Sequence, residues 1–202
     1  MFTGIVSDVG EVRAVTPRSG DLHRINIACA YPHESIALGA SIACAGVCLT
    51  VTDIAQDAGR TIFSIDAAAE TLRVTTTGQW KPGSKINLER SLKMGDELGG
   101  HLILGHVDGI ATLERREDLT DSARMTFRAP VALMRFIAPK GSVALDGVSL
   151  TVNEAGHDTF SVLIIPHTLQ VTTFSALRTG AGVNLEVDQM ARYAARLAEA
   201  RG

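Results

Sequence analysis

Small nucleophilic side chains stand at equivalent places in two copies of one short pattern. Gly-Val-Xaa-Leu-Thr-Val occurs twice, with Cys48 at the variable position of the first copy and Ser149 at that of the second. Thr50 and Thr151 follow two residues later, so each shares a strand face with its Cys or Ser. If these four side chains were only small packing residues of a barrel core, each thiol or hydroxyl would still need a hydrogen-bond partner. A polar ligand at each copy would supply those bonds, and a thiol or hydroxyl could also act as a nucleophile.

A histidine distinguishes the two copies. His106 lies between Gly105 and Val107, at the position that Ile5 takes in the first copy. Imidazole exchanges protons near neutral pH, so His106 is a candidate for proton transfer, with a hydrogen-bonded structural histidine as the alternative. His101 lies in a Gly-rich link and is the weaker candidate. The spacing of these histidines and the absence of a CxxC pair predict no metal site.

Two serines precede the variable positions by seven residues. Ser41 precedes Cys48 and Ser142 precedes Ser149 by the same interval, which favours hydroxyls in a turn or on a barrel rim.

The similarity extends over the whole chain. A shift of 101 residues places Gly4 on Gly105, and after the motif a shift of 97 places residues 87–89 on 184–186, both Asn-Leu-Glu. The matches stay in order, which indicates a duplicated domain of about a hundred residues.

The sequence of each copy predicts mostly β-strands, because apolar and polar residues alternate and are interrupted by Gly and Pro. Six short strands per copy predict a small closed barrel. The strands are expected at 9–15, 22–28, 41–45, 47–54, 60–65 and 85–89, and at 107–114, 123–129, 142–145, 148–154, 159–164 and 183–187. Short helices are expected at 32–37, 70–75 and 131–137, with a helical turn after Pro166.

The C-terminal segment is a helix former with Asp188 as its N-cap. Met190, Ala194 and Leu197 are spaced four and three residues apart, which forms a narrow stripe. The stripe favours either docking on the chain's own barrel or self-association.

Composition excludes several classes of function. The 202 residues are 46% hydrophobic and 20% charged with a net charge of −3, which argues against disorder and against binding to nucleic acid or an anionic membrane. No apolar run is long enough to span a bilayer. Three cysteines at irregular spacing and no signal-peptide pattern predict reduced thiols and a cytoplasmic protein.

Several motifs together resemble the alpha-type riboflavin synthase family. They are Met-Phe-Thr-Gly-Ile-Val at residues 1–6, Glu-Thr-Leu at 70–72, Gly-Gly-His-Leu at 99–102, Gly-His-Val at 105–107 and the two copies of the opening pattern. The resemblance covers essentially the whole chain. It implies an all-β fold of two six-stranded Greek-key closed barrels with short helices, plus a C-terminal α-helix. The expected domains are a first barrel at 1–97, a second at 98–188 and a trimerisation helix at 189–202.

The resemblance also implies a reaction. Two molecules of 6,7-dimethyl-8-ribityllumazine react with four-carbon transfer to give riboflavin and 5-amino-6-(D-ribitylamino)uracil, without cofactor or metal. A homotrimer is expected, with each active site holding two lumazines between the first barrel of one chain and the second barrel of its neighbour. Lumazine synthase is a further partner that the resemblance suggests. A non-catalytic lumazine or flavin carrier of the same fold is the alternative function, but such carriers tend to lose the second motif, which this chain keeps.

The family's roles transfer to matching positions. Residues implicated in catalysis are Phe2, Ser41, Cys48, His106, Ser149, Thr151 and Asp188. The first-barrel pocket is expected to comprise Gly4, Ile5, Val6, Cys48, Leu49, Thr50, Asp66, Ala67, Ala68, Ala69, Glu70 and Thr71. The second-barrel pocket is expected to comprise Gly105, His106, Val107, Lys140, Ser149, Leu150, Thr151, Leu163, Ile164, Ile165, Pro166, His167 and Thr168. His106 is the candidate for proton transfer, and Cys48 or Ser41 (or a water that they hold) is the candidate for addition to the acceptor ring.

Overall fold

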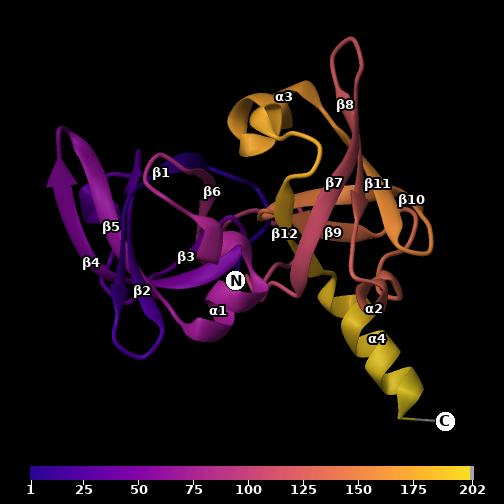
Figure 1. The fold of residues 1–202 in the computed structure, drawn as a ribbon, viewed down its shortest axis with the longest axis horizontal. Helices are drawn as coiled ribbons and strands as arrows, with labels where there is room; N and C mark the ends of the chain where they lie inside the picture. The colour runs from indigo at the N-terminus through magenta and orange to yellow at the C-terminus, as the bar shows by residue number, and fades with distance from the viewer. Residues whose placement is uncertain (201–202) are drawn as a thin grey trace.

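Two closed β-barrels lie side by side in the computed structural model, which describes residues 1–200 (Figure 1). Barrel 1 consists of β1 (Asp8–Arg18), β2 (Leu22–Cys29), β3 (Ser41–Cys44), β4 (Val47–Asp57), β5 (Arg60–Ala67) and β6 (Lys85–Arg90). Barrel 2 consists of β7 (Gly109–Asp118), β8 (Ala123–Arg128), β9 (Ser142–Leu145), β10 (Val148–Ala155), β11 (Thr159–Ile164) and β12 (Gly182–Val187). The predicted pair of six-stranded barrels is confirmed.

The strand order is a Greek key. In barrel 1 the neighbours run β1-β2-β5-β4-β3-β6, with β6 pairing back onto β1, and barrel 2 repeats this order from β7 to β12. All pairs are antiparallel, so one side-chain set of each strand fills the barrel and the other faces outward. Phe63, Ile25 and Ile65 are fully buried in the core of barrel 1, and Phe127 stacks on Phe160 in the core of barrel 2.

The helical segments are short, apart from the last. They are the 3-10 helices η1 (His33–Ser35), η2 (Thr76–Gln79) and η3 (Thr173–Ala176), and the α-helices α1 (Ala69–Val74), α2 (Val131–Met134), α3 (Pro166–Val171) and α4 (Gln189–Glu199). The helix predicted over 32–37 is wrong in type and extent. Pro32 caps a single 3-10 turn, and Ile36 is already extended because its side chain enters the barrel core. The helix predicted over 131–137 ends at Met134 and continues only as i→i+3 turns through Ile137.

Two buried asparagines join the barrels reciprocally. Asn184 of β12 accepts a hydrogen bond from the Thr76 backbone N–H at 2.7 Å and donates one to the Ala45 carbonyl at 2.8 Å. Asn87 of β6 accepts one from the Thr173 N–H at 2.9 Å and donates one to a carbonyl of barrel 2 at 3.0 Å. Each asparagine therefore satisfies two backbone groups of the opposite barrel.

The tight turns that begin the repeated pattern meet at the same junction. Gly46 and Gly147 have φ of +77° and +78°, and a Cβ on Gly46 would lie 2.6 Å from the backbone N of Gly147. Glycine is required there both for the left-handed backbone and for the contact between barrels.

Replacing Asn184 by Ala is expected to lower the free energy of unfolding by about 1–3 kcal/mol for each backbone group left unpaired. Urea denaturation would measure the loss. Asn153→Ala is the matched control, because Asn153 lies exposed on β10 and its loss should cost no more than about 0.5 kcal/mol. Equal midpoints for the two variants would contradict the assigned role.

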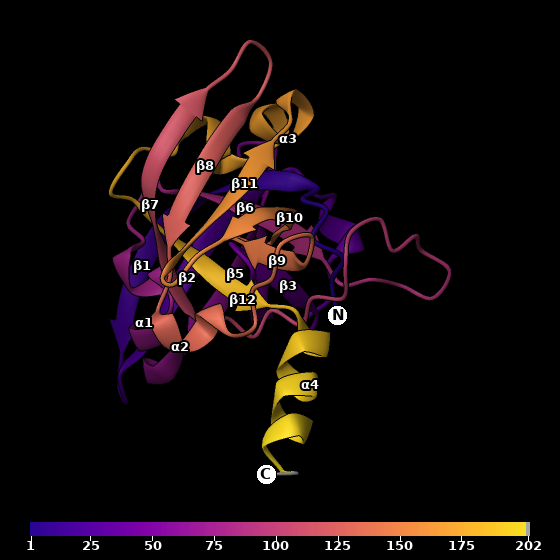
Figure 2. The ribbon, with the colours of Figure 1, turned by 90° about the vertical axis from the view of Figure 1, so that its right-hand side faces the viewer.

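The C-terminal helix stands away from the barrels (Figures 1 and 2). Asp188 caps α4 by accepting a hydrogen bond from the Met190 N–H at 2.8 Å, which confirms the predicted start of the helix. Arg192 pairs with Asp108 of the same chain, but Met190 and Leu197 are 80% and 63% exposed. The predicted stripe is therefore not covered by its own barrel. No helix within residues 1–200 is both long and apolar enough to cross a bilayer, and residues 201 and 202 of the predicted trimerisation segment lie outside the described residues.

Candidate functional site

The first polar face lies on the outside of barrel 1. On β4, Val47, Leu49 and Val51 enter the core, so Cys48 and Thr50 point outward. Ser41 pairs with Thr50 across β3 and β4, and Ala43 pairs with Cys48. Directly paired residues share a face of the sheet, so Ser41, Cys48 and Thr50 belong to one surface.

Barrel 2 repeats this surface with small changes. Ser142 pairs with Thr151 and Ala144 pairs with Ser149 across β9 and β10. The threonines of both copies are exposed, whereas Cys48 and Ser149 are partly buried. The repeated pattern therefore forms two outward polar faces, and each face carries one partly buried nucleophilic side chain.

The segments that precede the two barrels contact the strands that carry Cys48 and Ser149. The carbonyl of Gly105 accepts a hydrogen bond from the backbone N–H of Cys48 at 2.9 Å. The carbonyl of Gly4 accepts one from the N–H of Ser149 at 2.9 Å. Each segment thus reaches the polar face of the barrel that it does not precede.

The observed packing of these segments differs from the predicted division of the pockets in one respect. The sequence predicts residues 4–6 in the first-barrel pocket and residues 105–107 in the second, but Val6 packs against the core of barrel 2 and Val107 against that of barrel 1. Both motifs have nearly the same sequence, so the repeat alone does not indicate which of them a glycine segment contacts. As a result, His106, which lies in the segment before barrel 2, belongs with the Cys48 face of barrel 1.

Glycine is required at both places where one of these segments contacts the opposite barrel. Gly4 and Gly105 have φ of +79° and +77°. A Cβ on Gly105 would lie 2.6 Å from the Cβ of Cys48, and one on Gly4 would lie 2.5 Å from that of Ser149. Contacts this short do not occur between real Cβ atoms, so any other residue would push the segment off the face. Ile5 and His106, which follow these glycines, are both exposed.

His101, the weaker of the two histidine candidates in the sequence, lies beside Ser149. Its Nδ1 lies 2.7 Å from the Oγ of Ser149, within hydrogen-bond distance. A Cβ on Gly100 would lie 2.9 Å from the same Oγ, so glycine permits the approach. The Gly-Gly pair before His101 was the available signal, since adjacent glycines often mark a close approach of backbone.

The environment of His101 suits proton exchange with Ser149. Burial lowers the pKa of His101, and the nearby Asp188 carboxylate partly opposes this shift. The imidazole is then neutral at neutral pH, so it can accept the Ser149 proton. Asp188, predicted as catalytic, thus caps α4 and also acts electrostatically on His101.

Phe2 packs beside both polar faces. It is fully buried, forms an antiparallel bridge with Ile103, and packs with Ala43 and Ala144 in a small cluster on which Cys48 rests. Ala43 and Ala144 pair with Cys48 and Ser149, so Phe2 packs on the outward-facing side of these strands, beside the two polar faces.

The two predicted turn segments flank the faces. Val51 pairs with Ile65 near the end of β5, and α1 begins soon after, at Ala69. Val152 pairs with Val162 near the end of β11, and α3 begins soon after, at Pro166. The predicted ligand residues that are exposed there are Ala68, Ala69, Glu70, Leu163, Ile165, Pro166 and His167.

Other predicted ligand residues face inward or are already paired. The side chains of Leu49, Ala67, Leu150 and Ile164 enter the barrel cores, so only their backbones are left to contact a ligand on the polar faces. Asp66 accepts two hydrogen bonds from Arg24, at 2.8 and 2.7 Å, and these bonds hold its pKa below the usual range. Lys140 is exposed, and its N–H bonds the carbonyl of Val152, next to Thr151.

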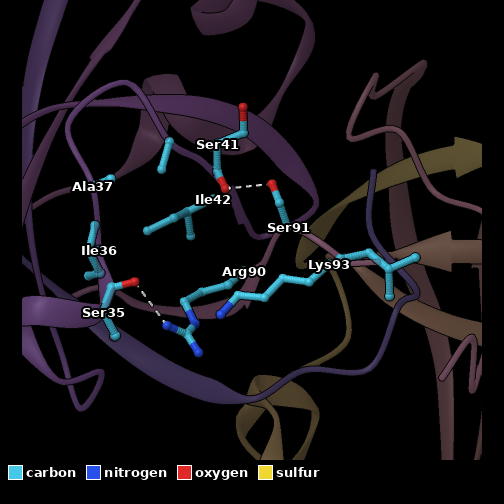
Figure 3. A pocket seen from close by; sticks show the side chains of 10 residues that line it. Ser35, Ile36, Ala37, Ser41, Ile42, Arg90, Ser91 and Lys93 are labelled. Carbon is cyan, nitrogen blue, oxygen red and sulfur yellow. Dashed lines mark hydrogen bonds between the residues drawn. The ribbon is translucent and has the colours of Figure 1, made fainter. Parts of the chain in front are cut away.

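A cavity of about 220 Å³ opens beside Ser41 (Figure 3). Its wall is held by a hydrogen bond of 2.9 Å from Ser91 to the Ser41 carbonyl, and Arg90 and Lys93 also line it. Typical ligand pockets measure about 300–1,000 Å³, so this cavity is too small to enclose a two-ring ligand. A larger cavity of about 790 Å³ lies between the barrels near Trp80, but neither Cys48 nor Ser149 lines it. Thr50 and Thr151 are exposed on the two polar faces, and neither of these two cavities is lined by Cys48 or Ser149.

Comparison with known proteins gives consistent matches. The family model described as "Lumazine binding domain" matches residues 3–91 and again 104–188. The chain is similar to proteins named riboflavin synthase. It is 55% identical to that of Brucella abortus (strain 2308), covering 98% of both chains. It is 40% identical to that of Mycobacterium tuberculosis (strain ATCC 25618 / H37Rv), covering 100% of both.

Solved structures of similar fold carry bound ligands. LumP complexed with riboflavin superposes with a TM-score of 0.83 at 26% identity, covering 94% of this chain and 100% of LumP. LumP complexed with 6,7-dimethyl-8-(1'-D-ribityl) lumazine superposes with a TM-score of 0.81 at 24% identity and the same coverage, which supports the fold.

Proposed function

This chain belongs to the riboflavin synthase family, as two copies of the lumazine-binding domain, and we propose that its two polar faces hold the two lumazine molecules of one reaction. The enzyme converts two molecules of 6,7-dimethyl-8-ribityllumazine into riboflavin and 5-amino-6-(D-ribitylamino)uracil. The observation that carries this conclusion is the full-length 55% identity to a riboflavin synthase. The duplicated face of thiol and hydroxyl groups agrees with it.

We propose that the Cys48 face holds the acceptor and the Ser149 face holds the donor. The 7-methyl protons of the lumazine are acidic because the anion is delocalised into the ring, so a modest base removes one. The Ser149–His101 pair is such a base, with its hydrogen bond already formed. Cys48, or a water held by Cys48 and Ser41, adds to the acceptor ring, and His106 moves a proton beside it.

Positioning supplies much of the remaining acceleration. Two flat rings held face to face react as one molecule, an effect worth up to about 7–11 kcal/mol. Thr50 and Thr151 are exposed on the two faces and offer hydroxyls to the rings and ribityl chains. Backbone groups at Leu49 and Leu150 add further hydrogen bonds.

We propose that the working form is a homotrimer. The polar faces of one chain are open, and the apolar stripe of α4 is exposed, so both surfaces lack a cover within the described chain. Association through α4 would bury the stripe and bring barrel 1 of one chain against barrel 2 of the next. Each active site would then be completed by two chains.

We also propose a cytoplasmic location. Cys29, Cys44 and Cys48 are all free thiols, and reduced thiols are typical of that compartment. Burial raises the pKa of Cys44, which keeps this thiol protonated and inert.

Turnover of the lumazine alone tests the function. The purified chain, given 6,7-dimethyl-8-ribityllumazine and no other reactant, is expected to develop the absorption of riboflavin. Cys48→Ala is the matched variant. It should still bind lumazine, followed by fluorescence, but form riboflavin about 10²-fold or more slowly. Tight binding by the wild type without turnover would identify a non-catalytic lumazine carrier of the same fold instead.

A further inference from the structure

A buried glutamate follows each of the bridging asparagines. Glu89 on β6 and Glu186 on β12 are the last residues of the repeated Asn-Leu-Glu, and they are 7% and 3% exposed. Carboxylates are almost never buried this far unless they are fully paired. Their partners therefore indicate what they do.

Glu186 holds the segment that carries His106. One carboxylate oxygen accepts a hydrogen bond from the N–H of Leu104 at 2.8 Å, and the other accepts one from the N–H of Gly105 at 2.9 Å. The carbonyl of Gly105 in turn accepts from the N–H of Cys48 at 2.9 Å. A continuous path of hydrogen bonds thus runs from Glu186 through Gly105 to Cys48, and His106 is the next residue.

Glu89 holds the segment of Thr3 and Gly4, whose carbonyls bond to His101 and Ser149. Its carboxylate accepts from the N–H and the hydroxyl of Thr3, both at 2.7 Å, and from the N–H of Gly4 at 2.9 Å. The carbonyl of Thr3 accepts from the N–H of His101 at 3.1 Å, and that of Gly4 accepts from the N–H of Ser149. Glu89 therefore fixes both members of the Ser149–His101 pair.

We propose that Glu89 and Glu186 are positioning residues, each of which aligns one proton-transfer group of the opposite half of the reaction. Glu186 aligns His106 with Cys48, and Glu89 aligns His101 with Ser149. This assignment rests on the function proposed above. It extends that function to two residues that touch neither ligand.

The chemistry requires a carboxylate at both places. Each glutamate uses both oxygens to accept from backbone N–H groups. Glutamine has nearly the same shape but only one acceptor oxygen, so its NH₂ group would face an N–H donor. The glycine segment must then move, and a displacement of about 1 Å can cost up to ~10²-fold in rate.

Paired substitutions test the proposal. Glu186→Gln and Glu89→Gln are each expected to lower kcat by about 10–100-fold, with little change in lumazine affinity. Glu186→Gln should lower kcat much less in a His106→Ala background, while keeping its full effect in a His101→Ala background. Glu89→Gln should show the reverse pattern. The two glutamates serve as matched controls for each other.

A purely structural role gives a different result. Effects that multiply equally in both histidine backgrounds, or wild-type kcat in both glutamine variants, would overturn the proposal. If a glutamine variant does not fold, as judged by thermal unfolding, the corresponding Asp variant carries the same test. Failure of the wild type to form riboflavin would count against the proposed function instead, so the two failures are distinguishable.

Discussion

Replacing His101 by Ala is expected to lower the turnover of lumazine by about 10²–10⁴-fold, the range for loss of a positioned general base. The 2.7 Å contact between His101 and the Ser149 hydroxyl is the reason, because Ser149 then lacks its proton acceptor. Affinity for lumazine should change little, since the polar face of β10 remains. Steady-state kinetics with fluorescence titration would separate the two quantities.

The pH profile distinguishes a base from a packing residue. Burial lowers the pKa of His101, so its neutral form persists to lower pH than that of an ordinary histidine near about 6.5. Turnover should therefore fall on the acid side only below that value, and His101→Ala should remove this acid limb. Ser149→Ala and the double variant should lose about as much as His101→Ala alone, because the pair acts as a unit.

His157→Ala is the control for this prediction. His157 is exposed in the turn between β10 and β11, away from the polar face, so kinetics and pH profile should match those of the wild type. A His101→Ala variant that keeps its acid limb would assign the proton transfer to another group.

Deletion of residues 189–202 is expected to convert a trimer into monomers that have lost most activity. The deletion removes α4 and its exposed stripe but leaves both barrel cores complete. Because each site is proposed to need two chains, monomers would bind lumazine without joining two molecules. Sedimentation velocity and the riboflavin assay would be run on the same samples, and a fully active monomer would contradict the shared site.

Complementation tests the same arrangement without truncation. Cys48→Ala damages the face on barrel 1 and His101→Ala the face on barrel 2. In trimers reassembled from an equimolar mixture, about a quarter of the sites would pair two intact faces, so about a quarter of wild-type turnover should return. A site within one chain would restore none.

Much of the fold is predictable because it follows from local rules. Alternation along β4 places Leu49 inside and Cys48 outside without reference to any other strand. The duplication makes the second barrel predictable from the first, and Asp188 is recognisable as a cap from its side chain. Helix lengths were less predictable, since Ile36 is drawn into the barrel core and ends η1 early.

The composition of the sites depends on contacts between distant segments. Spacing identifies Cys48, Ser149, His106 and the glycines as unusual, because their types recur at matched positions in the repeat. Whether Gly105 meets Cys48 or Ser149 is a matter of tertiary packing, since two near-identical motifs offer it the same hydrogen bond. The same holds for His101, whose partner lies 48 residues away. Local pattern therefore specifies the barrels and the polar faces, and only the packing of one barrel on the other assigns a histidine to each face.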